Sequence, residues 1–204
     1  MGEGPKSVMM AGARGAVIGL LLCGQPPAQA ATVEGTVTLG SRPVPQAVIY
    51  LERTGAPPAV ASPARVVMDQ RNLNFVPAVL PVVRGTAIEF TNSDDVQHNV
   101  FSPSATAGKF NLGTYGPGAT RTITLNEPGD VLVLCNIHME MQAHILVLND
   151  PYFSLVTADS TYRIADVPPG TYVLKIWHEH WLTFSQSVEV PAAESLTVNV
   201  TAGK

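Results

Sequence analysis

The stretch that most constrains the fold is residues 131–146, VLVLCNIHMEMQAHIL. It begins with four consecutive apolar residues, continues through a loop, and leads into a second apolar run at residues 145–148. Short apolar runs separated by a loop are typical of buried β-strands. We therefore expect two neighbouring strands of a packed sheet, with the loop side chains gathered at one edge of that sheet.

The loop between these runs carries Cys135, His138 and Met141, a C-x2-H-x2-M spacing. Soft sulfur ligands and imidazole suit copper, and two histidines, one cysteine and a weak axial methionine make up a blue-copper electron-transfer site. The loop supplies three of these four ligands, and His98 is the best candidate for the second histidine. The sequence thus predicts one type 1 copper ion bound by His98, Cys135, His138 and Met141.

The rest of the chain reads as an all-β protein. Proline and glycine occur 17 times each and charged residues make up 14% of the chain, which indicates a turn-rich, packed β fold. No pattern predicts a helix longer than two turns. Strand patterns occupy residues 32–38, 44–52, 65–70, 79–83, 86–91, 121–125, 131–134, 145–148, 153–157, 160–164, 171–177 and 196–200. Residues 102–120, rich in Gly, Ser, Thr and Pro, are expected to form a long surface excursion.

Residues 1–30 have the pattern of a cleaved export signal. Lys6 and Arg14 precede the apolar run 16–22, and the sequence AQA at 28–30 matches a cleavage site. The apolar run is too short to span a bilayer, so we expect a periplasmic or otherwise exported protein with no membrane span after cleavage. Cleavage removes Cys23 and leaves Cys135 as the sole cysteine. A lipoprotein signal built on Cys23 is disfavoured because Leu22 occupies the position of a small residue.

Taken singly, the four candidate ligands have plainer explanations. A free cysteine is most often a small buried hydrophobe, a lone histidine is most often structural, and a methionine often fills a core. Their combination at this spacing, in an exported chain without a disulfide partner, favours copper. The net charge of −4 argues against a nucleic-acid partner.

The segments 75–102 (FVPAVLPVVRGTAIEFTNSDDVQHNVFS) and 128–147 (PGDVLVLCNIHMEMQAHILV) resemble the cupredoxins, the plastocyanin-like and amicyanin-like small blue copper proteins. The resemblance implies a Greek-key β-sandwich and a redox protein partner. It also implies that Asn99, which follows the first ligand, ties the two ligand loops together by hydrogen bonds. The short spacing between His138 and Met141 is more similar to amicyanin and pseudoazurin than to plastocyanin.

Residues 33–52 and 159–179 resemble a different family, the carboxypeptidase regulatory-like, or transthyretin-like, β-sandwich. We therefore expect a discontinuous second small β-sandwich, formed by residues 31–62 and 150–204 and interrupted by a cupredoxin domain at residues 63–149. Insertion of a domain into a surface loop is physically reasonable. Strands of one larger sandwich before and after the cupredoxin are the alternative.

The expected function is single-electron transfer between redox partners, without an enzymatic reaction. The alternative is a periplasmic protein that stores or delivers copper, with Met139, His144 and the pair His178 and His180 as extra contacts. A multicopper oxidase is disfavoured because Cys135 is not flanked by histidines. A nitrite-reductase-like second site would need ligands from another subunit. A further alternative places the function in the outer sandwich, which the intact ligand set disfavours.

Four smaller expectations concern residues near these motifs. The apolar residues Ile137 and Met139 are expected to form a docking face beside His138. Asp94 and Asp95 are expected to form a turn. His144 is expected to be a surface residue at an ordinary strand start. In a continued strand, His178 and His180 would share one face, opposite Trp177, Glu179 and Trp181. An aromatic-packed strand end is a plainer explanation of this stretch than a second metal site.

Overall fold

The structure is a computed structural model of the 204-residue chain, and it describes residues 1–2, 4, 30–55, 65–105, 108–180 and 184–202. The predicted export signal and the predicted linker around residue 60 fall almost wholly outside these ranges. Throughout the described part of the chain every regular element is a strand, which confirms the all-β prediction. No helix in that part is long and apolar enough to cross a membrane.

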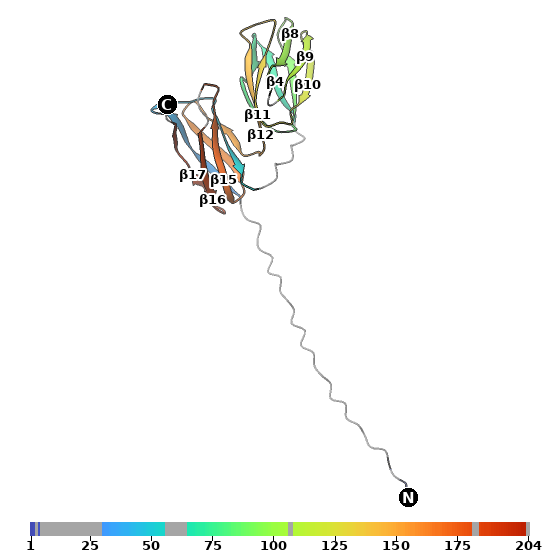
Figure 1. Cartoon of the computed structure of the whole chain (residues 1–204), viewed down its shortest axis with the longest axis vertical. Coiled ribbons are helices and arrows are strands. Elements are labelled where there is room, and N and C mark those ends of the chain that lie inside the picture. The colour runs from blue at the N-terminus through green and yellow to red at the C-terminus, as the bar shows by residue number, and fades with distance from the viewer. Residues whose placement is uncertain (3, 5–29, 56–64, 106–107, 181–183, 203–204) are drawn as a thin grey trace.

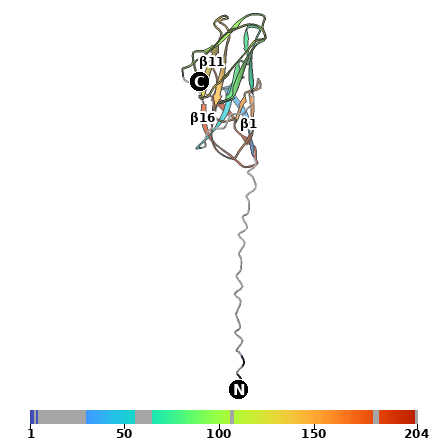
Figure 2. The ribbon, with the colours of Figure 1, turned by 90° about the vertical axis from the view of Figure 1, so that its right-hand side faces the viewer.

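The strands gather in two lobes that lie side by side (Figures 1 and 2). The central lobe comprises residues 65–148, and the flanking lobe comprises residues 30–55 together with the described residues from 149 onward. Strands from both ends of the chain therefore pair with each other, and the middle of the chain forms a separate sandwich.

Two sheets build the central lobe. One has the order β10-β7-β4-β5 and the other β6-β12-β11-β8-β9. Most neighbours are antiparallel, but β4 pairs with β7, and β12 with β6, in parallel. The strands are β4 (Val66–Arg71), β5 (Asn74–Val76), β6 (Val79–Val83), β7 (Ala87–Asn92), β8 (His98–Ser102), β9 (Phe110–Tyr115), β10 (Thr120–Thr124), β11 (Gly129–Leu134) and β12 (Gln142–Leu148).

Alternation along these strands directs side chains into the space between the sheets. On β11, Val131 and Val133 are buried in the core, and Cys135 continues the same face one residue beyond the strand. On β8, His98, Val100 and Ser102 are buried. Two strands of one sheet therefore bring a thiol and an imidazole to the same buried layer.

The flanking lobe is also a pair of sheets. Strands β14, β1 and β17 lie in order in one sheet, where β18 and β2 also pair with β1, and the other has the order β13-β3-β15-β16. The strands are β1 (Ala31–Leu39), β2 (Arg42–Pro43), β3 (Val48–Arg53), β13 (Phe153–Leu155), β14 (Thr161–Val167), β15 (Gly170–Trp177), β16 (Phe184–Val190), β17 (Leu196–Thr197) and β18 (Val200–Ala202). Apolar side chains from both sheets form one core, separate from that of the central lobe.

A third, smaller apolar cluster joins the two lobes. Leu146 and Leu148, on the outward face of β12, pack with Val48 and Trp177 of the flanking lobe. The inward face of the same strand, with Ile145 and Val147, lies in the core of the central lobe. Strand β12 is therefore buried on both faces, and the strand that leaves the Cys–His–Met loop is held between the lobes.

The structure contains strands that the sequence patterns did not predict, among them β5, β8, β9 and β16. Residues 110–115 form β9 within the segment expected to be a structureless excursion, and Tyr115 at its end is buried. Residues 184–190 form β16, for which no strand was predicted. Strand β15 ends at Trp177, as the predicted strand 171–177 does, and residues 178–180 leave the sheet, so His178 and His180 do not share one face of a continued strand.

Candidate metal centre

The loop between β11 and β12 is closed by its own backbone. The Cys135 amide donates to the Met141 carbonyl at 3.3 Å, and the Met141 amide donates to the His138 carbonyl at 3.0 Å. Leu134 and Gln142 are paired directly beneath the loop. The strand ladder therefore determines where the loop begins and ends, and the turn inside it points His138 back over Cys135.

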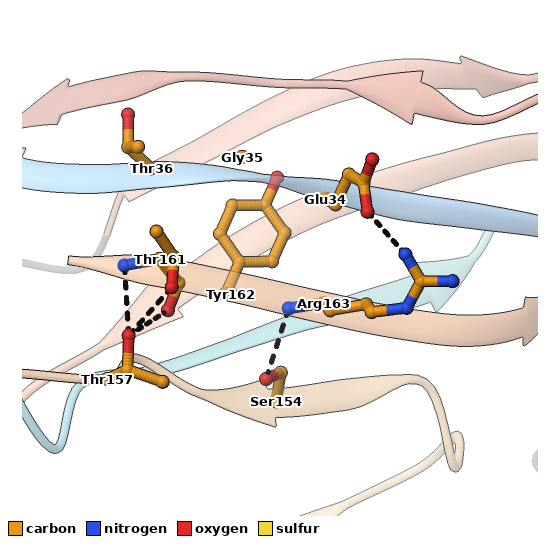
Figure 3. Close-up of a pocket in the computed structure, with 8 residues that line it drawn as sticks. All are labelled: Glu34, Gly35, Thr36, Ser154, Thr157, Thr161, Tyr162 and Arg163. Atoms are coloured by element: carbon orange, nitrogen blue, oxygen red, sulfur yellow. Dashed lines mark hydrogen bonds and ion pairs between the residues drawn. The ribbon is translucent and has the colours of Figure 1, made fainter. Parts of the chain in front are cut away.

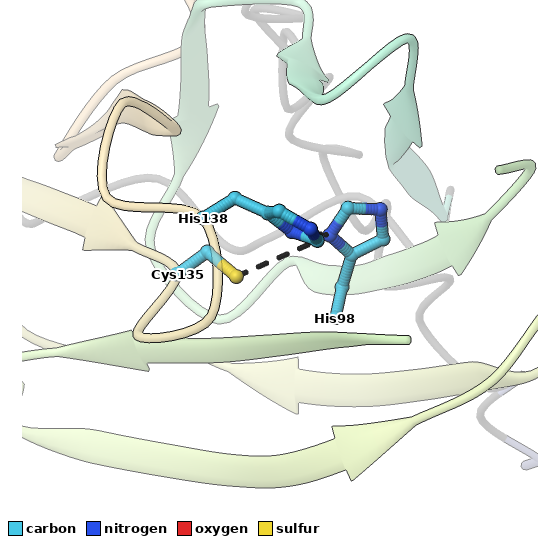
Figure 4. Close-up of side chains that lie close together, drawn as sticks. All are labelled: His98, Cys135 and His138. Atoms are coloured by element: carbon cyan, nitrogen blue, oxygen red, sulfur yellow. Dashed lines mark hydrogen bonds between the residues drawn. The ribbon is translucent and has the colours of Figure 1, made fainter. Parts of the chain in front are cut away.

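Three predicted ligands converge on one point (Figure 4). The His98 Nδ1 and His138 Nδ1 atoms are 3.1 Å apart, and the Cys135 Sγ lies 4.0 Å from His98 Nδ1. His98 is fully buried and Cys135 is 3% exposed, whereas His138 is partly exposed. In the described part of the chain this is the one group of three His, Cys, Asp or Glu residues whose ligand atoms all lie within 4.8 Å of one another.

The donor set and its spacing fit a bound transition metal. Ligand bonds of about 2.0–2.3 Å place donor atoms roughly 3–4 Å apart around one ion. Neither imidazole can keep a proton on Nδ1 when it binds a metal, so the short Nδ1–Nδ1 approach suits a shared ion. The fourth predicted ligand, Met141, is buried in the same core as Cys135 and belongs to the same loop.

The ring of His98 is held on its far side by Asp94. The Asp94 Oδ2 lies 2.9 Å from His98 Nε2. Its carboxylate also accepts hydrogen bonds from the amides of Asn72 at 2.6 Å and Leu73 at 3.0 Å. Burial alone would raise the pKa of the Asp94 carboxyl, but the bonds from Leu73, His98 and Asn72 lower this pKa below its ordinary value. An ionised carboxylate only accepts, so His98 carries its proton on Nε2 and leaves Nδ1 free for a metal.

Asp94 also joins the ligand to a tight turn. Asn72 and Leu73, which connect β4 and β5, both have positive φ angles, 52° and 56°. This left-handed conformation is costly for residues with a side chain, and both amides of the turn are bound by Asp94. Asp94 does form a turn, with its amide bonded to Asn92 Oδ1, but its contact with His98 was missed. The four-residue separation of Asp94 and His98 was the available signal.

Asn99 joins the two ligand-bearing segments as expected, but through its backbone and not through its side chain. Its backbone amide donates to Cys135 Sγ at 3.5 Å, which connects the His98 strand to the thiol. Its side-chain amide donates to Asn111 Oδ1 at 2.9 Å, on β9, rather than to the loop that carries the other ligands. The Asn99 Oδ1 atom is buried and has no hydrogen-bond partner among the described residues.

Apolar side chains surround the partly exposed edge of the cluster. Met139 is 83% exposed and Ile137 is 44% exposed, on either side of His138. Val96, two residues before His98, is 43% exposed. The exposed apolar residues expected beside His138 are therefore accessible to a partner.

The other histidines lie apart from this cluster. His144 is on the outward face of β12, and its Nδ1 is 2.9 Å from Asp130 Oδ1 and its Nε2 3.6 Å from Glu179 Oε2. It is mostly buried against the flanking lobe, unlike the surface residue that was expected. His178 and His180 lie in the turn after β15, where the His180 amide donates to His178 Nδ1 at 3.2 Å. Trp181, expected in this stretch, lies outside the described residues.

A depression lies in the flanking lobe, lined by residues other than the sulfur–imidazole cluster (Figure 3). It has a volume of about 510 Å³, and hydroxyl groups and one ion pair line it. The Arg163 guanidinium is paired with Glu34 at 2.5 Å, and the hydroxyls of Thr157 and Thr161 bond to each other at 2.8 Å. Because these polar groups are paired with one another, the depression supplies no convergent donor set comparable to that of the central lobe.

Comparisons with known proteins agree with the geometry of the central lobe. Residues 63–148, less than half of the chain, match the model of the copper binding proteins of the plastocyanin/azurin family. No curated protein matches the chain. A copper-containing nitrite reductase (NirK) from Thermus scotoductus SA-01 is 27% identical, with a TM-score of 0.41, over 46% of this chain and only 25% of the reductase.

Two small cupredoxins match over nearly their whole length. A reduced amicyanin variant is 18% identical over 48% of this chain and 99% of its own, with a TM-score of 0.39. A purple cupredoxin from Nitrosopumilus maritimus is 21% identical over 42% of this chain and 99% of its own, with a TM-score of 0.36. The segment matched by the copper-binding family model, residues 63–148, is the segment that carries the His–Cys–His cluster and the nearby methionine.

Proposed function

We propose that this chain is an exported type 1 copper protein that carries single electrons between redox partners. One copper ion would be held by His98, Cys135, His138 and Met141. The observation that carries the proposal is the convergence of His98 Nδ1, His138 Nδ1 and Cys135 Sγ, at separations of 3.1 and 4.0 Å. A donor set of two imidazoles and a thiolate, with a thioether beside it, suits copper.

Bound copper would supply one-electron chemistry by alternating between Cu(I) and Cu(II). The contribution of the chain is to hold the donors still. His98 is fixed by Asp94 on one side, Cys135 ends a paired strand, and His138 lies in a backbone-closed loop. Donors that need not rearrange between the two oxidation states suit a carrier better than a protein that must release its metal.

The surroundings of the sulfur support the same role. Cys135 is 3% exposed and accepts a hydrogen bond from the Asn99 amide. Hydrogen bonding and low solvent access around the cysteine sulfur are among the features that tune the reduction potential of such sites. A buried thiol is also protected from oxidation and from disulfide exchange in an oxidising compartment.

We place the point of electron entry and exit at His138. Its partly exposed ring lies between the exposed side chains of Ile137 and Met139. An apolar rim suits a weak, short-lived complex with a redox protein, because it excludes water without requiring specific ion pairs. The remaining ligand histidine, His98, is fully buried and offers no such edge.

Export and domain organisation belong to the same proposal. Export rests on the signal pattern of residues 1–30, which lie almost wholly outside the described part of the chain. We further propose that residues 31–62 and 150–204 form one sandwich into which the cupredoxin domain, residues 63–149, is inserted. Antiparallel pairing of β1 with β14 and of β3 with β15 supports this organisation.

Copper storage or delivery is the second candidate. The observation that favours it is the exposed thioether of Met139 next to His138, because a soft exposed ligand could receive Cu(I) from the site. This function requires that copper leave the site readily, whereas an electron carrier must retain it.

A titration of the full chain with Cu(II), followed by visible spectroscopy, tests the proposal. We expect an intense thiolate-to-copper band that saturates at one equivalent and is absent in Cys135→Ser. Glu34→Gln, in the depression of the flanking lobe, is the matched control and should leave the band unchanged. A colourless wild-type complex, or reduction of the copper with oxidation of the protein, would contradict a type 1 site.

A further inference from the structure

A second group of metal-ligating side chains lies where the two lobes meet. His144 comes from β12 of the central lobe, and Glu179 and His180 come from the turn after β15 of the flanking lobe. The indole of Trp177 contacts the His144 ring, with a centroid separation of 5.1 Å. The apolar cluster that joins the lobes therefore has a polar margin containing histidines and carboxylates.

The ring of His144 lies between two carboxylates. Its Nδ1 is 2.9 Å from Asp130 Oδ1, a hydrogen-bond distance, and an ionised carboxylate can only accept. The proton of the neutral ring therefore sits on Nδ1. The Nε2 atom then presents a lone pair to Glu179 Oε2 at 3.6 Å, a distance too long for a hydrogen bond. Two facing lone pairs repel each other unless a cation or a proton lies between them.

The other oxygen of Glu179 faces a second imidazole. The Glu179 Oε1 atom lies 3.1 Å from His180 Nε2. A different oxygen of Glu179 thus faces each imidazole, at 3.6 Å for His144 and 3.1 Å for His180. The three donors do not all lie within 4.8 Å of one another in the structure, so the 69% exposed His180 imidazole must rotate toward His144 to complete the set.

We propose that His144, Glu179 and His180 form a second metal site, for a divalent ion of the zinc(II) or copper(II) class, which joins the two lobes. Imidazole and carboxylate donors suit both ions. Asp130 would orient His144 from behind, as carboxylates commonly do for metal-binding histidines. Three protein donors leave a fourth position for water.

His178 is not one of the ligands in this proposal. Its Nδ1 accepts the amide hydrogen of His180, so that nitrogen is used within the turn. Burial lowers the pKa of His178 below its ordinary value, and the nearby His180 and His144 lower this pKa further while Glu179 raises it. His178 therefore belongs to the turn that presents Glu179 and His180 rather than to the ligand set.

Zinc titration of the full chain tests this site. The chain is first loaded with one equivalent of Cu(II), because zinc follows copper in affinity for such donors and should not displace it. Isothermal titration calorimetry with zinc chloride should then show one further equivalent. The affinity should fall at least tenfold in His144→Gln and Glu179→Gln. The control Glu194→Gln, which removes an exposed carboxylate of the flanking lobe, should bind zinc as the wild type does.

The same comparison works when the first site is empty of copper. In a Cys135→Ser background, His98 and His138 can also bind zinc, but that binding does not depend on Glu179. The second site is therefore measured as the zinc equivalent that is lost in Glu179→Gln. His180→Asn alters an exposed side chain without disturbing the fold, and it too should weaken zinc binding. The proposal is overturned if the wild type takes up no second equivalent at millimolar zinc, or if Glu179→Gln and Glu194→Gln bind zinc equally.

Discussion

The two lobes differ in how many polar side chains they bury. Seven of the eight buried polar or charged residues in the described chain lie in the central lobe, and the flanking lobe contributes only Ser160. The seven are Asp69, Gln70, Thr86, Asn92, His98, Asn99 and Ser102. The flanking lobe instead keeps its polar groups at the surface and pairs them there, as Glu34 and Arg163 show.

This difference means that only the central lobe carries the free-energy cost of several buried polar groups. A buried polar group costs free energy unless its hydrogen bonds are complete, and two buried oxygens of the central lobe, Gln70 Oε1 and Asn99 Oδ1, have no partner among the described residues. Departures from good packing rules are expected at functional sites. Gln70 bonds to the hydroxyl of Tyr115, which is paired with His98 across β8 and β9. The buried polar residues with unpaired oxygens, Gln70 and Asn99, therefore lie close to the candidate copper ligand His98.

The largest effect on stability should come from Asn92→Ala. The Asn92 side chain donates to the carbonyls of Val96 and Tyr115 and accepts from the Asp94 amide, so it holds the loop that carries His98. Loss of these buried bonds should lower the free energy of unfolding by about 3 kcal/mol. Urea denaturation measures this change.

Asn199→Ala is the matched control for this comparison. Asn199 is exposed in the flanking lobe and accepts hydrogen bonds from Thr36 at 3.0 and 3.1 Å. Its loss should cost no more than about 1 kcal/mol. Equal costs for the two asparagines would contradict the difference drawn between the lobes.

A second test uses pH. Burial alone would raise the pKa of the Asp69 carboxyl, but hydrogen bonds from Thr91 and Ser93 and the nearby Arg71 lower this pKa below its ordinary value. A lowered folded-state pKa means that the stabilisation is fully present above the unfolded-state pKa of about 3.9 and is lost as the pH falls through the folded-state value. Asp69→Asn should therefore be less stable near neutral pH by about 1.5–3 kcal/mol.

The gap between wild type and Asp69→Asn should close as the pH falls below about 4. Denaturation curves collected from neutral to acidic pH check this. A gap that stays constant across the acidic range would show that the charge of Asp69 does not stabilise the central lobe.

Asp94→Asn should weaken copper binding, and it should also lower the free energy of unfolding because the Asp94 carboxylate accepts the amides of Asn72 and Leu73. The variant keeps the shape of the side chain but loses the negative charge that faces His98 Nε2. Replacing a group that orients a metal-bound histidine typically costs about 10–100-fold in metal affinity. Competition with a chelator measures the change. Asp95→Asn, an exposed neighbour, is the control and should retain wild-type affinity.

The smallest structural effect is expected from Met139→Glu. Met139 is almost fully exposed, so the substitution should leave stability and the visible spectrum unchanged. It places a charge on the proposed docking rim and should slow electron transfer to a redox protein by about tenfold, the size of a modest interface contribution. Stopped-flow kinetics with an electron-accepting protein measure this rate. An unchanged rate would show that the redox partner does not dock on the apolar rim around His138.

Much of the central lobe could be predicted from sequence because its signals are local. The alternation of Val131 and Val133 leads to Cys135, and the C-x2-H-x2-M spacing lies in one short loop. Strand β9 was missed because Phe110–Tyr115 contains Gly113, has few β-branched residues and follows a turn-rich stretch. The composition of that stretch outweighed the weak alternation that places Tyr115 inside.

Contacts between distant or differently folded segments could not be predicted. The approach of His144 to Glu179 depends on how β12 packs against the flanking lobe, which no local pattern encodes. The stretch after Trp177 has the composition of a strand, but the chain turns there before it returns as β16 to pair with β15. Asp94 was read correctly as a turn former, and only the coordinates show that the turn places its carboxylate on His98.

Copper retention through redox cycling tests the central claim most directly. The copper-loaded chain is reduced and reoxidised repeatedly in the presence of a Cu(I)-selective chelator, and copper remaining on the protein is measured after each cycle. Donors held as firmly as His98 and Cys135 should retain the ion and recover the full visible band every time. Transfer of copper to the chelator in the first reduced phase would contradict an electron carrier and identify a copper-delivery protein.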